Sequence, residues 1–291
     1  MSFGRQVGQS LGLLVLAAAA AYGAGAEVDH ARKLYNRTDF EQSLKILNSI
    51  ADKDAAAYEL MGRNYYMQSE FKKASEAFEK AFAEQPANSQ YALWLGRAHG
   101  RRAENATPFT APSQATKARQ YFEKAVALDP KNVEALADLF EYYLEAPGFL
   151  GGGMDKAERT AKQLAELEAG EGHWARAKMA EKRKDYALAE EQWRKAIEAS
   201  PQQVGRLIDL ARFLAKQGRM PEAEQNLAKA DKLAPESAKL CFAKADIYIK
   251  HKVNLDVAKD LLKRYISNSN LTPDDPPKAQ AEKLLRQVQG A

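Results

Sequence analysis

The apolar residues of this chain follow the spacing of amphipathic α-helices, and the pattern repeats. The clearest copy reads Tyr58-x-x-Met61-Gly62-x-x-Tyr65, then Phe71-x-x-Ala74-x-x-x-Phe78-x-x-Ala81, and closes with Pro86. The same arrangement returns about every 34 residues. Each period therefore predicts two helices, A and B, joined by a short turn, and a proline that ends helix B.

Seven such units follow one another, and the first is degenerate because no proline closes it. They lie at 27–54, 55–88, 89–132, 133–169, 170–203, 204–236 and 237–270, within a repeat region of 27–275. Asp275 as N-cap and Pro276 as first helical residue then predict a capping helix over 276–291. One unit cannot bury its own apolar face, so we expect an all-α stack with a continuous core.

The repeated pattern resembles the tetratricopeptide repeat (TPR), which implies a right-handed solenoid of about seven helix–turn–helix units. Small residues such as Gly62 and Gly96 allow helices A and B to approach closely, and we expect Phe78 and Phe122 to fill the gap to the next repeat. Residues 95–98 and 107–112, taken with 145–153, are also similar to uncharacterised exported bacterial TPR proteins. That second resemblance implies no activity.

Residues 1–26 have the pattern of a secretory signal peptide. Arg5 precedes an apolar run from Leu11 to Ala21, which is shorter than the ~20 residues needed to span a bilayer. Ala24-Gly25-Ala26 supplies the small residues that signal peptidase recognises, so cleavage is expected after Ala26. We expect a periplasmic or secreted protein with no membrane span after cleavage. The alternative is an uncleaved signal anchor.

The remaining composition indicates neither catalysis nor a cofactor. Cys241 is the single cysteine and falls in a helical apolar pattern, and the net charge of +4 with interspersed signs shows no nucleic-acid footprint. The four histidines are dispersed without metal-ligand spacing, and His99 occupies a helix-core position. The glycines of 148–153 are followed by Met154 and Asp155 where a phosphate-binding loop needs Lys and Ser or Thr, which excludes that motif. We therefore expect no enzyme activity, no cofactor and no metal.

Two consecutive units are longer than the others between helices A and B, at 103–114 and 146–153. Equivalent turns of adjacent repeats lie side by side on one edge of a solenoid, and insertions on one face often mark a binding face. We expect the apolar tips to meet as a lip at the mouth of the groove. The alternative is that these side chains plug the ends of their own helix pairs. The lip residues are Pro108, Phe109, Phe149 and Leu150.

The TPR resemblance also implies a concave groove lined mainly by the A helices. Carried over by position, the candidate partner-binding residues are Arg63, Tyr66, Leu93, Arg97, Arg101, Glu141, Glu145, Trp174, Lys178 and Arg212. Basic residues dominate both halves of this surface, an acidic patch lies in the middle, and an apolar ribbon runs alongside. Such a surface suits a peptide with acidic ends and apolar anchors. In the alternative, Arg63 or Arg97 pairs with glutamates of neighbouring repeats and the face is only solvated.

Three classes of function compete on this sequence. The first is an exported scaffold or adaptor that binds a protein or peptide of unknown identity in its groove, with homo-oligomerisation as a variant. The second is a small-ligand-binding component of an envelope transport system, whose pocket is built by the two turn insertions. An enzyme ranks last because no residues with catalytic spacing occur.

Overall fold

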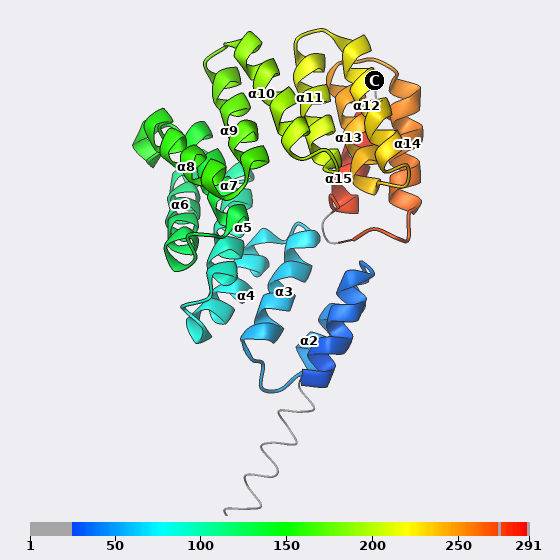
Figure 1. Ribbon diagram of the computed structural model, residues 1–291. Helices are drawn as coiled ribbons and strands as arrows, with labels where there is room; N and C mark the ends of the chain where they lie inside the picture. Colours follow the sequence, from blue (N-terminus) through cyan, green and yellow to red (C-terminus); the bar gives the residue numbers. More distant parts are fainter. Residues whose placement is uncertain (1–24, 273–274, 290–291) are drawn as a thin grey trace, which may run out of the picture.

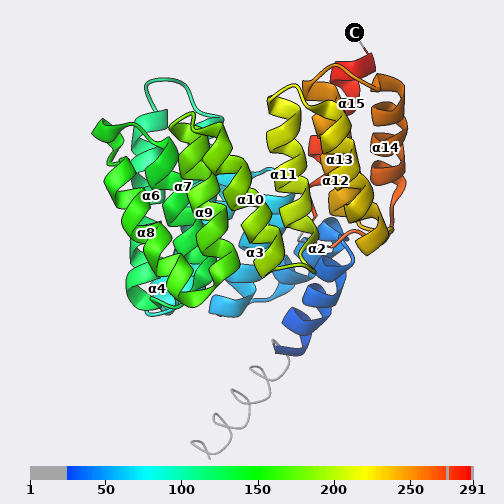
Figure 2. The same ribbon diagram turned by 45° about the horizontal axis from the view of Figure 1, so that its top comes forward.

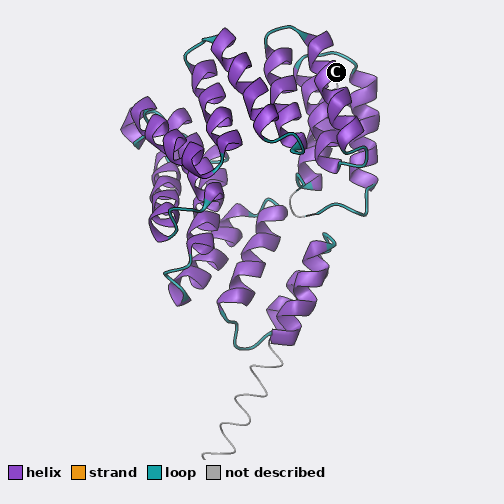
Figure 3. Ribbon diagram, viewed as in Figure 1, coloured by secondary structure: helices purple, strands orange, loops and turns teal. Residues whose placement is uncertain are grey.

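A computed structural model describes residues 25–272 and 275–289. The regular secondary structure of this part of the chain consists of α-helices and one short 3-10 helix, joined by loops (Figure 3). The expected signal peptide lies outside the described residues except for its last two. Those two residues belong to a helix that spans residues 25–36.

The helices follow one another as antiparallel A and B pairs. After the helix at 25–36 the elements are α2 (Phe40–Ser49), α3 (Ala55–Met67), α4 (Phe71–Glu84), α5 (Ser89–Glu104), α6 (Ala111–Leu128), α7 (Val133–Glu145), the 3-10 helix η1 (Gly148–Leu150), α8 (Met154–Leu167), α9 (Ala169–Lys182), α10 (Tyr186–Ala199), α11 (Val204–Lys216), α12 (Met220–Leu233), α13 (Ala238–Lys250), α14 (Leu255–Ser267) and α15 (Lys278–Gln289).

Local hydrogen bonds explain where several helices begin. Asp54 and Asn132 each accept a hydrogen bond from a backbone N–H in the first turn of an A helix, at 2.8 and 3.0 Å. Five of the described A–B turns contain a residue in the left-handed region just after helix A, which lets the chain reverse within a few residues. These residues are Thr38, Ser69, Lys184, Gly218 and Lys252. The third and fourth repeats lack this short turn, as their extra length requires.

Glycines allow the paired helices to approach closely, as the sequence predicted. A Cβ atom on Gly62 would lie 2.5 Å from the ring of Phe78, and one on Gly96 would lie 2.4 Å from the ring of Phe122. The Phe78 ring also stacks on Trp94 of the next repeat, with the ring centroids 5.7 Å apart. The same phenylalanine therefore packs within its own repeat and against the next one.

The stack curves until its two ends approach each other (Figures 1 and 2). A cavity of about 780 Å³ lies between them, lined by Phe40 and Leu44 of the first repeat and by Leu271 and Pro277 near the C-terminus. Helix α15 packs on α14 and α13 and covers the last repeat. Like the sequence-predicted solenoid, the observed fold is all-helical and built from repeated helix pairs.

The predicted N-cap of the last helix was wrong. Helix α15 begins at Lys278, and the Asp275 carboxylate instead accepts hydrogen bonds from the backbone N–H and the hydroxyl of Thr272, at 2.8 and 3.0 Å. The Pro276 carbonyl accepts a hydrogen bond from the Tyr265 hydroxyl. The sequence Asp-Pro-Pro therefore forms part of a connecting segment that is held against α14.

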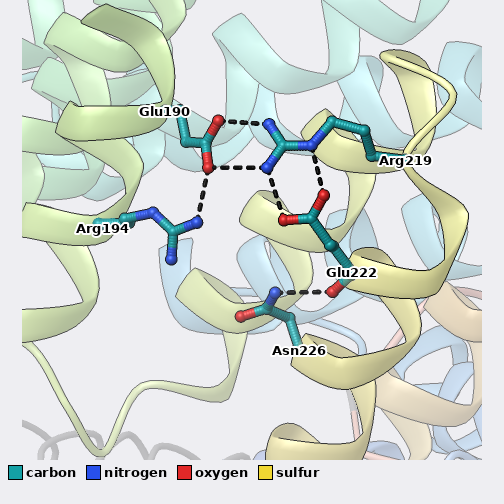
Figure 4. Close-up of polar contacts among 5 residues, drawn as sticks. All are labelled: Glu190, Arg194, Arg219, Glu222 and Asn226. Atoms are coloured by element: carbon teal, nitrogen blue, oxygen red, sulfur yellow. Dashed lines mark hydrogen bonds and ion pairs between the residues drawn. The ribbon is translucent and has the colours of Figure 1, made fainter. Parts of the chain in front are cut away.

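An ion-pair network joins the B helices of the fifth and sixth repeats (Figure 4). Arg219, at the start of α12, lies 2.5 Å from Glu190 of α10 and donates to Glu222 at 2.6 Å. Arg194 reaches the same Glu190 carboxylate at 2.6 Å, and Asn226 donates to the Glu222 carbonyl at 2.8 Å. The hydrogen bond from Arg219 is the main cause of a lowered pKa for the Glu190 carboxyl.

Candidate functional site

The A helices form the inner side of the curve, and those of neighbouring repeats contact each other, as α7 does α9 and α11 does α13 (Figure 1). Many charged side chains on this side pair with an A helix one repeat away. Arg97 of α5 donates to Asp138 and Glu134 of α7 at 2.6 and 3.1 Å. Lys182 of α9 donates to Glu145 of α7 at 2.7 Å.

The alternative interpretation of the groove charges is therefore correct for Arg97. Further pairs of this kind are Lys178 with Glu141, Arg206 with Glu171, and Arg32 with Glu59, whereas Lys216 lies farther, at 3.5 Å, from Glu181. Arg101 pairs within its own helix, with Glu104 at 2.6 Å. Much of the charge that the sequence assigned to a partner is neutralised between repeats.

A cluster of aromatic and cationic side chains lies on the inner side of the second and third repeats. Trp94 has the guanidinium groups of Arg63 and Arg97 over its ring, at 4.8 and 5.0 Å from the centroid. Tyr66 meets the same indole edge-on at 5.4 Å, and burial raises the pKa of its hydroxyl. Sequence reasoning missed Trp94.

The assignment of Leu93 to the groove was wrong. Leu93 is 0% exposed and packs in the core of its repeat, while its neighbour Trp94 contributes to the inner surface. Adjacent residues of a helix point in directions that differ by about 100°. An error of one residue in the assigned helix phase therefore assigns a core side chain to the groove and a groove side chain to the core. Trp174 is likewise 8% exposed: it packs on Phe140, and Lys178 lies over its ring at 5.0 Å. Its ring is thus mostly covered.

A groove of about 650 Å³ lies between the C-terminal halves of α9 and α11. Three of its basic side chains are weakly paired or unpaired: Arg212 is 3.9 Å from Asp209, Lys216 is 3.5 Å from Glu181, and the exposed Lys184 forms no ion pair with any described residue. Tyr186 lies beside them and is 42% exposed. We define these four residues, Lys184, Tyr186, Arg212 and Lys216, as the cationic groove. Of these four residues, Arg212 is among the partner-binding candidates of the sequence analysis, whereas Lys184 and Tyr186 belong to the turn and to helix B, which a pattern based on helix A does not reach.

A half-buried carboxyl group, that of Asp209, also lines the cationic groove. Desolvation raises the pKa of Asp209, and the nearby guanidinium groups of Arg206 and Arg212 act in the opposite direction. Arg206 is 8% exposed and lies with its guanidinium 5.7 Å from the ring centroid of Trp174. Asp209 is thus shared between two arginines and neutralises neither of them at short range.

The tips of the two long turns point into solvent. Phe109 is 95% exposed and Phe149 is 82% exposed, so the alternative that they plug their helix pairs is wrong. Pro108 is also exposed, whereas Leu150 is half-buried and its carbonyl accepts a hydrogen bond from the Tyr142 hydroxyl at 2.9 Å.

The structure does not bring the two turns together around one pocket. Much of the predicted 103–114 insertion lengthens α5 and α6, and only 105–110 separates the helices. This turn shares a cavity with the turn of the second repeat, residues 69–73. The 146–153 turn instead packs on its own repeat and on α6, where a Cβ on Gly151 would meet Arg119 at 2.8 Å.

Two of the residues that the sequence analysis set aside, Cys241 and His99, lie in the core. Cys241 is 8% exposed. His99 is fully buried, its Nδ1 lies 2.9 Å from the Gln114 amide oxygen, its ring stacks on Tyr121, and burial lowers its pKa. Among the described residues no group of His, Cys, Asp or Glu could hold a metal ion. No helix in residues 25–272 and 275–289 is long and apolar enough to cross a membrane.

Comparisons with known proteins concern one part of the sequence and the fold. A family model described as tetratricopeptide repeat matches residues 59–133. The fold is similar to a thermophilic TPR protein from Thermus thermophilus, with 19% identity, a TM-score of 0.53, and coverage of 66% of this chain and 98% of that one. It is also similar to a tetratricopeptide repeat protein from Parabacteroides merdae, with 14% identity, a TM-score of 0.57, and coverage of 91% and 98%.

Human IFIT1, solved as a dimer with PPP-AAAA, has a similar fold at 19% identity and a TM-score of 0.54. The match covers 82% of this chain and 54% of IFIT1. No curated protein matches the sequence significantly. At these identities the structural likenesses establish the fold.

Proposed function

We propose that this chain, a tetratricopeptide repeat protein, is an exported scaffold without enzyme activity that binds an acidic segment of a protein partner in its cationic groove. TPR-type helical repeats suit a protein-interaction role. The single observation that carries the proposal is the incomplete pairing of Arg212, Lys216 and Lys184 beside the exposed ring of Tyr186.

The basic side chains and the aromatic ring of the cationic groove indicate what kind of partner would fit it. Two or three carboxylates spaced along an extended or helical segment would complete the pairing of the basic side chains, and an apolar or aromatic residue between them would cover the Tyr186 ring. Exposed charge pairs contribute modestly to affinity and more to association rate, so binding should weaken as salt is added. Release of the mature chain into the periplasm would bring it to such partners.

Variants of the full chain test the groove. Arg212→Glu combined with Lys216→Glu reverses two charges on α11, and Lys229→Glu combined with Lys232→Glu makes the same change on α12 of the same repeat. Lys229 and Lys232 are exposed and form no ion pair with a described residue. Each protein is used as bait against envelope extract. A protein captured by the wild type and the α12 variant but lost from the α11 variant supports the proposal. A partner retained by the α11 variant contradicts it.

Export is tested separately by fractionation and N-terminal mass determination. A periplasmic species that begins at Glu27 would agree with cleavage after Ala26. A full-length species in the inner membrane would indicate the anchor instead, and a cytoplasmic protein would contradict export. Capture of a second copy of the chain by the bait would mean that the protein forms a homo-oligomer.

A second candidate is a small-ligand-binding component of an envelope transport system. The observation that favours it is the cavity between the turns at 69–73 and 105–110. This cavity involves one of the two turn insertions and not the other.

A further inference from the structure

The cavity between the turns at 69–73 and 105–110 lies on the edge of the solenoid, away from the cationic groove. Its volume is about 600 Å³, which is within the range typical of small-molecule sites, ~300–1,000 Å³. Two elements form its walls: the turn of the second repeat with the start of α4, residues 69–73, and the end of α5 with the 105–110 turn and the start of α6. We call this cavity the edge pocket.

Arg102 gives the edge pocket an uncompensated positive charge. Its half-buried guanidinium donates one hydrogen bond, to the neutral Ser75 hydroxyl at 2.8 Å, and forms no ion pair with a described residue. Arg97 and Arg101 on the same helix are each paired with carboxylates. A guanidinium has five N–H donors in a fixed fork that matches a carboxylate or a phosphate, so most of the binding capacity of Arg102 is unused.

The other charges of the edge pocket leave a net positive balance. Lys73 pairs with Glu70, which neutralises both. Lys72 lies 4.0 Å from Glu76, and both side chains are more than half exposed, so this pair contributes little. Lys72 and Arg102 both line the pocket, and neither has a close carboxylate partner. The first turns of α4 and α6 lie at the pocket, and neither N-cap residue, Glu70 or Thr110, makes a side-chain capping bond, so backbone N–H groups there lack a side-chain acceptor.

The pocket also offers an apolar wall. Phe71 is held in place by the edge of Tyr66 at 5.3 Å and by the guanidinium of Arg101 at 5.2 Å from its ring centroid. Ala106 faces the same cavity, and Asn105 and Gln114 supply amide groups. The pocket therefore combines a cation, a fixed aromatic surface and neutral polar groups.

We propose that the edge pocket binds a small organic anion that has a carboxylate or phosphate group next to an apolar or aromatic body. The anionic group pairs with Arg102 and Lys72, and the body packs on Phe71. This site is separate from the cationic groove, so ligand binding here does not depend on a protein partner there.

His99 lies next to the pocket, and its pKa can report whether an anion is bound there. Gln114 lines the cavity and contacts His99 at 2.9 Å. His99 Nε2 lies 3.7 Å from the Glu79 carboxylate. Burial is the main cause of the lowered pKa of His99 and the Gln114 hydrogen bond opposes it; the charges of Arg102 and Lys117 lower the pKa further, and that of Glu79 raises it. An anion on Arg102 cancels part of the positive field, so the pKa of His99 should rise when the pocket is filled.

The test uses the full chain and three probes: phenylacetate, phenyl phosphate and the neutral 2-phenylethanol. Saturable binding of an anion with a Kd on the order of 1 mM is expected by calorimetry or NMR titration. The neutral probe should bind about tenfold or more weakly. Phenyl phosphate binding tighter than phenylacetate would indicate phosphorylated ligands, and the reverse order would indicate carboxylates.

Arg102→Gln removes the charge and keeps an N–H donor for Ser75, whose hydroxyl also donates to the Lys72 carbonyl at 2.8 Å. We expect this variant to fold, to lose about tenfold or more in anion affinity, and to lose the ligand-induced rise of the His99 pKa. Arg176→Gln, at another arginine without an ion pair to a described residue, is the matched control and should bind as the wild type does. Equal binding of 2-phenylethanol and phenylacetate, unchanged affinity in Arg102→Gln, or absence of saturable binding would each overturn the proposal.

Discussion

One added methyl group at Gly96 tests how closely α5 and α6 approach. Its carbon would lie 2.4 Å from Cδ1 and 2.5 Å from Cε1 of Phe122, and this ring is 7% exposed. The ring must move within a packed core, at a cost of about 1–3 kcal/mol. Gly100 lies one turn later on the same helix, and a Cβ atom there meets nothing within 4 Å. Both Gly→Ala changes gain about 1 kcal/mol of helix propensity, so this gain cancels in the comparison.

Urea unfolding of the two variants, followed by circular dichroism, measures the difference. We expect Gly100→Ala to be as stable as the wild type or up to about 1 kcal/mol more stable. Gly96→Ala should be about 1–3 kcal/mol less stable than Gly100→Ala. Phe122→Leu added to Gly96→Ala should cost less than Phe122→Leu alone, because it relieves the contact. Equal stability of the two alanine variants would refute the close approach.

Other predictions concern single residues. Stability should fall as the pH drops below about 6.5, because folding keeps His99 neutral with a lowered pKa while the unfolded chain protonates it; His99→Gln should flatten this part of the urea-midpoint profile. Leu93→Ala should lower the free energy of unfolding by about 2–5 kcal/mol in the same urea assay, since the side chain is 0% exposed. Phe109→Ser with Phe149→Ser should change stability by no more than about 0.5 kcal/mol in a thermal melt, and a large fall would contradict their exposure. Arg219→Ala should lower the unfolding midpoint at low salt and less so in about 1 M salt, because its exposed ion pairs are screened.

The fold could be predicted because the residues that determine the helix ends and the helix pairing lie within each repeat. Caps such as Asp54 and Asn132, closing prolines such as Pro86, and the pairing of Gly62 with Phe78 act over a few residues or within one repeat. A local signal of this kind is visible in sequence. Stacking then propagates it, because each repeat contacts only its neighbours.

The surface could be predicted less well, since it depends on helix phase and on contacts between repeats. A shift of one residue exchanged Leu93 for Trp94 at the groove. The extra residues near 103–114 could equally form a loop or lengthen the helices, and helical propensity in 111–128 favoured longer helices. The pairing of Arg97 with Asp138 joins residues 41 positions apart, which no short motif encodes.

Those pairings change how charge on a solenoid should be interpreted. Arg97, Lys178, Lys182 and Arg206 each reach a carboxylate on an A helix one repeat away, so they connect consecutive repeats on the inner side of the curve. A partner that took those carboxylates' place would first have to break contacts within the solenoid. Cations without a close carboxylate carry no such cost. In the cationic groove on the inner side and at Arg102 on the edge, incompletely paired cations also line a cavity of about 650 or 600 Å³, and we therefore propose these two places for ligand binding.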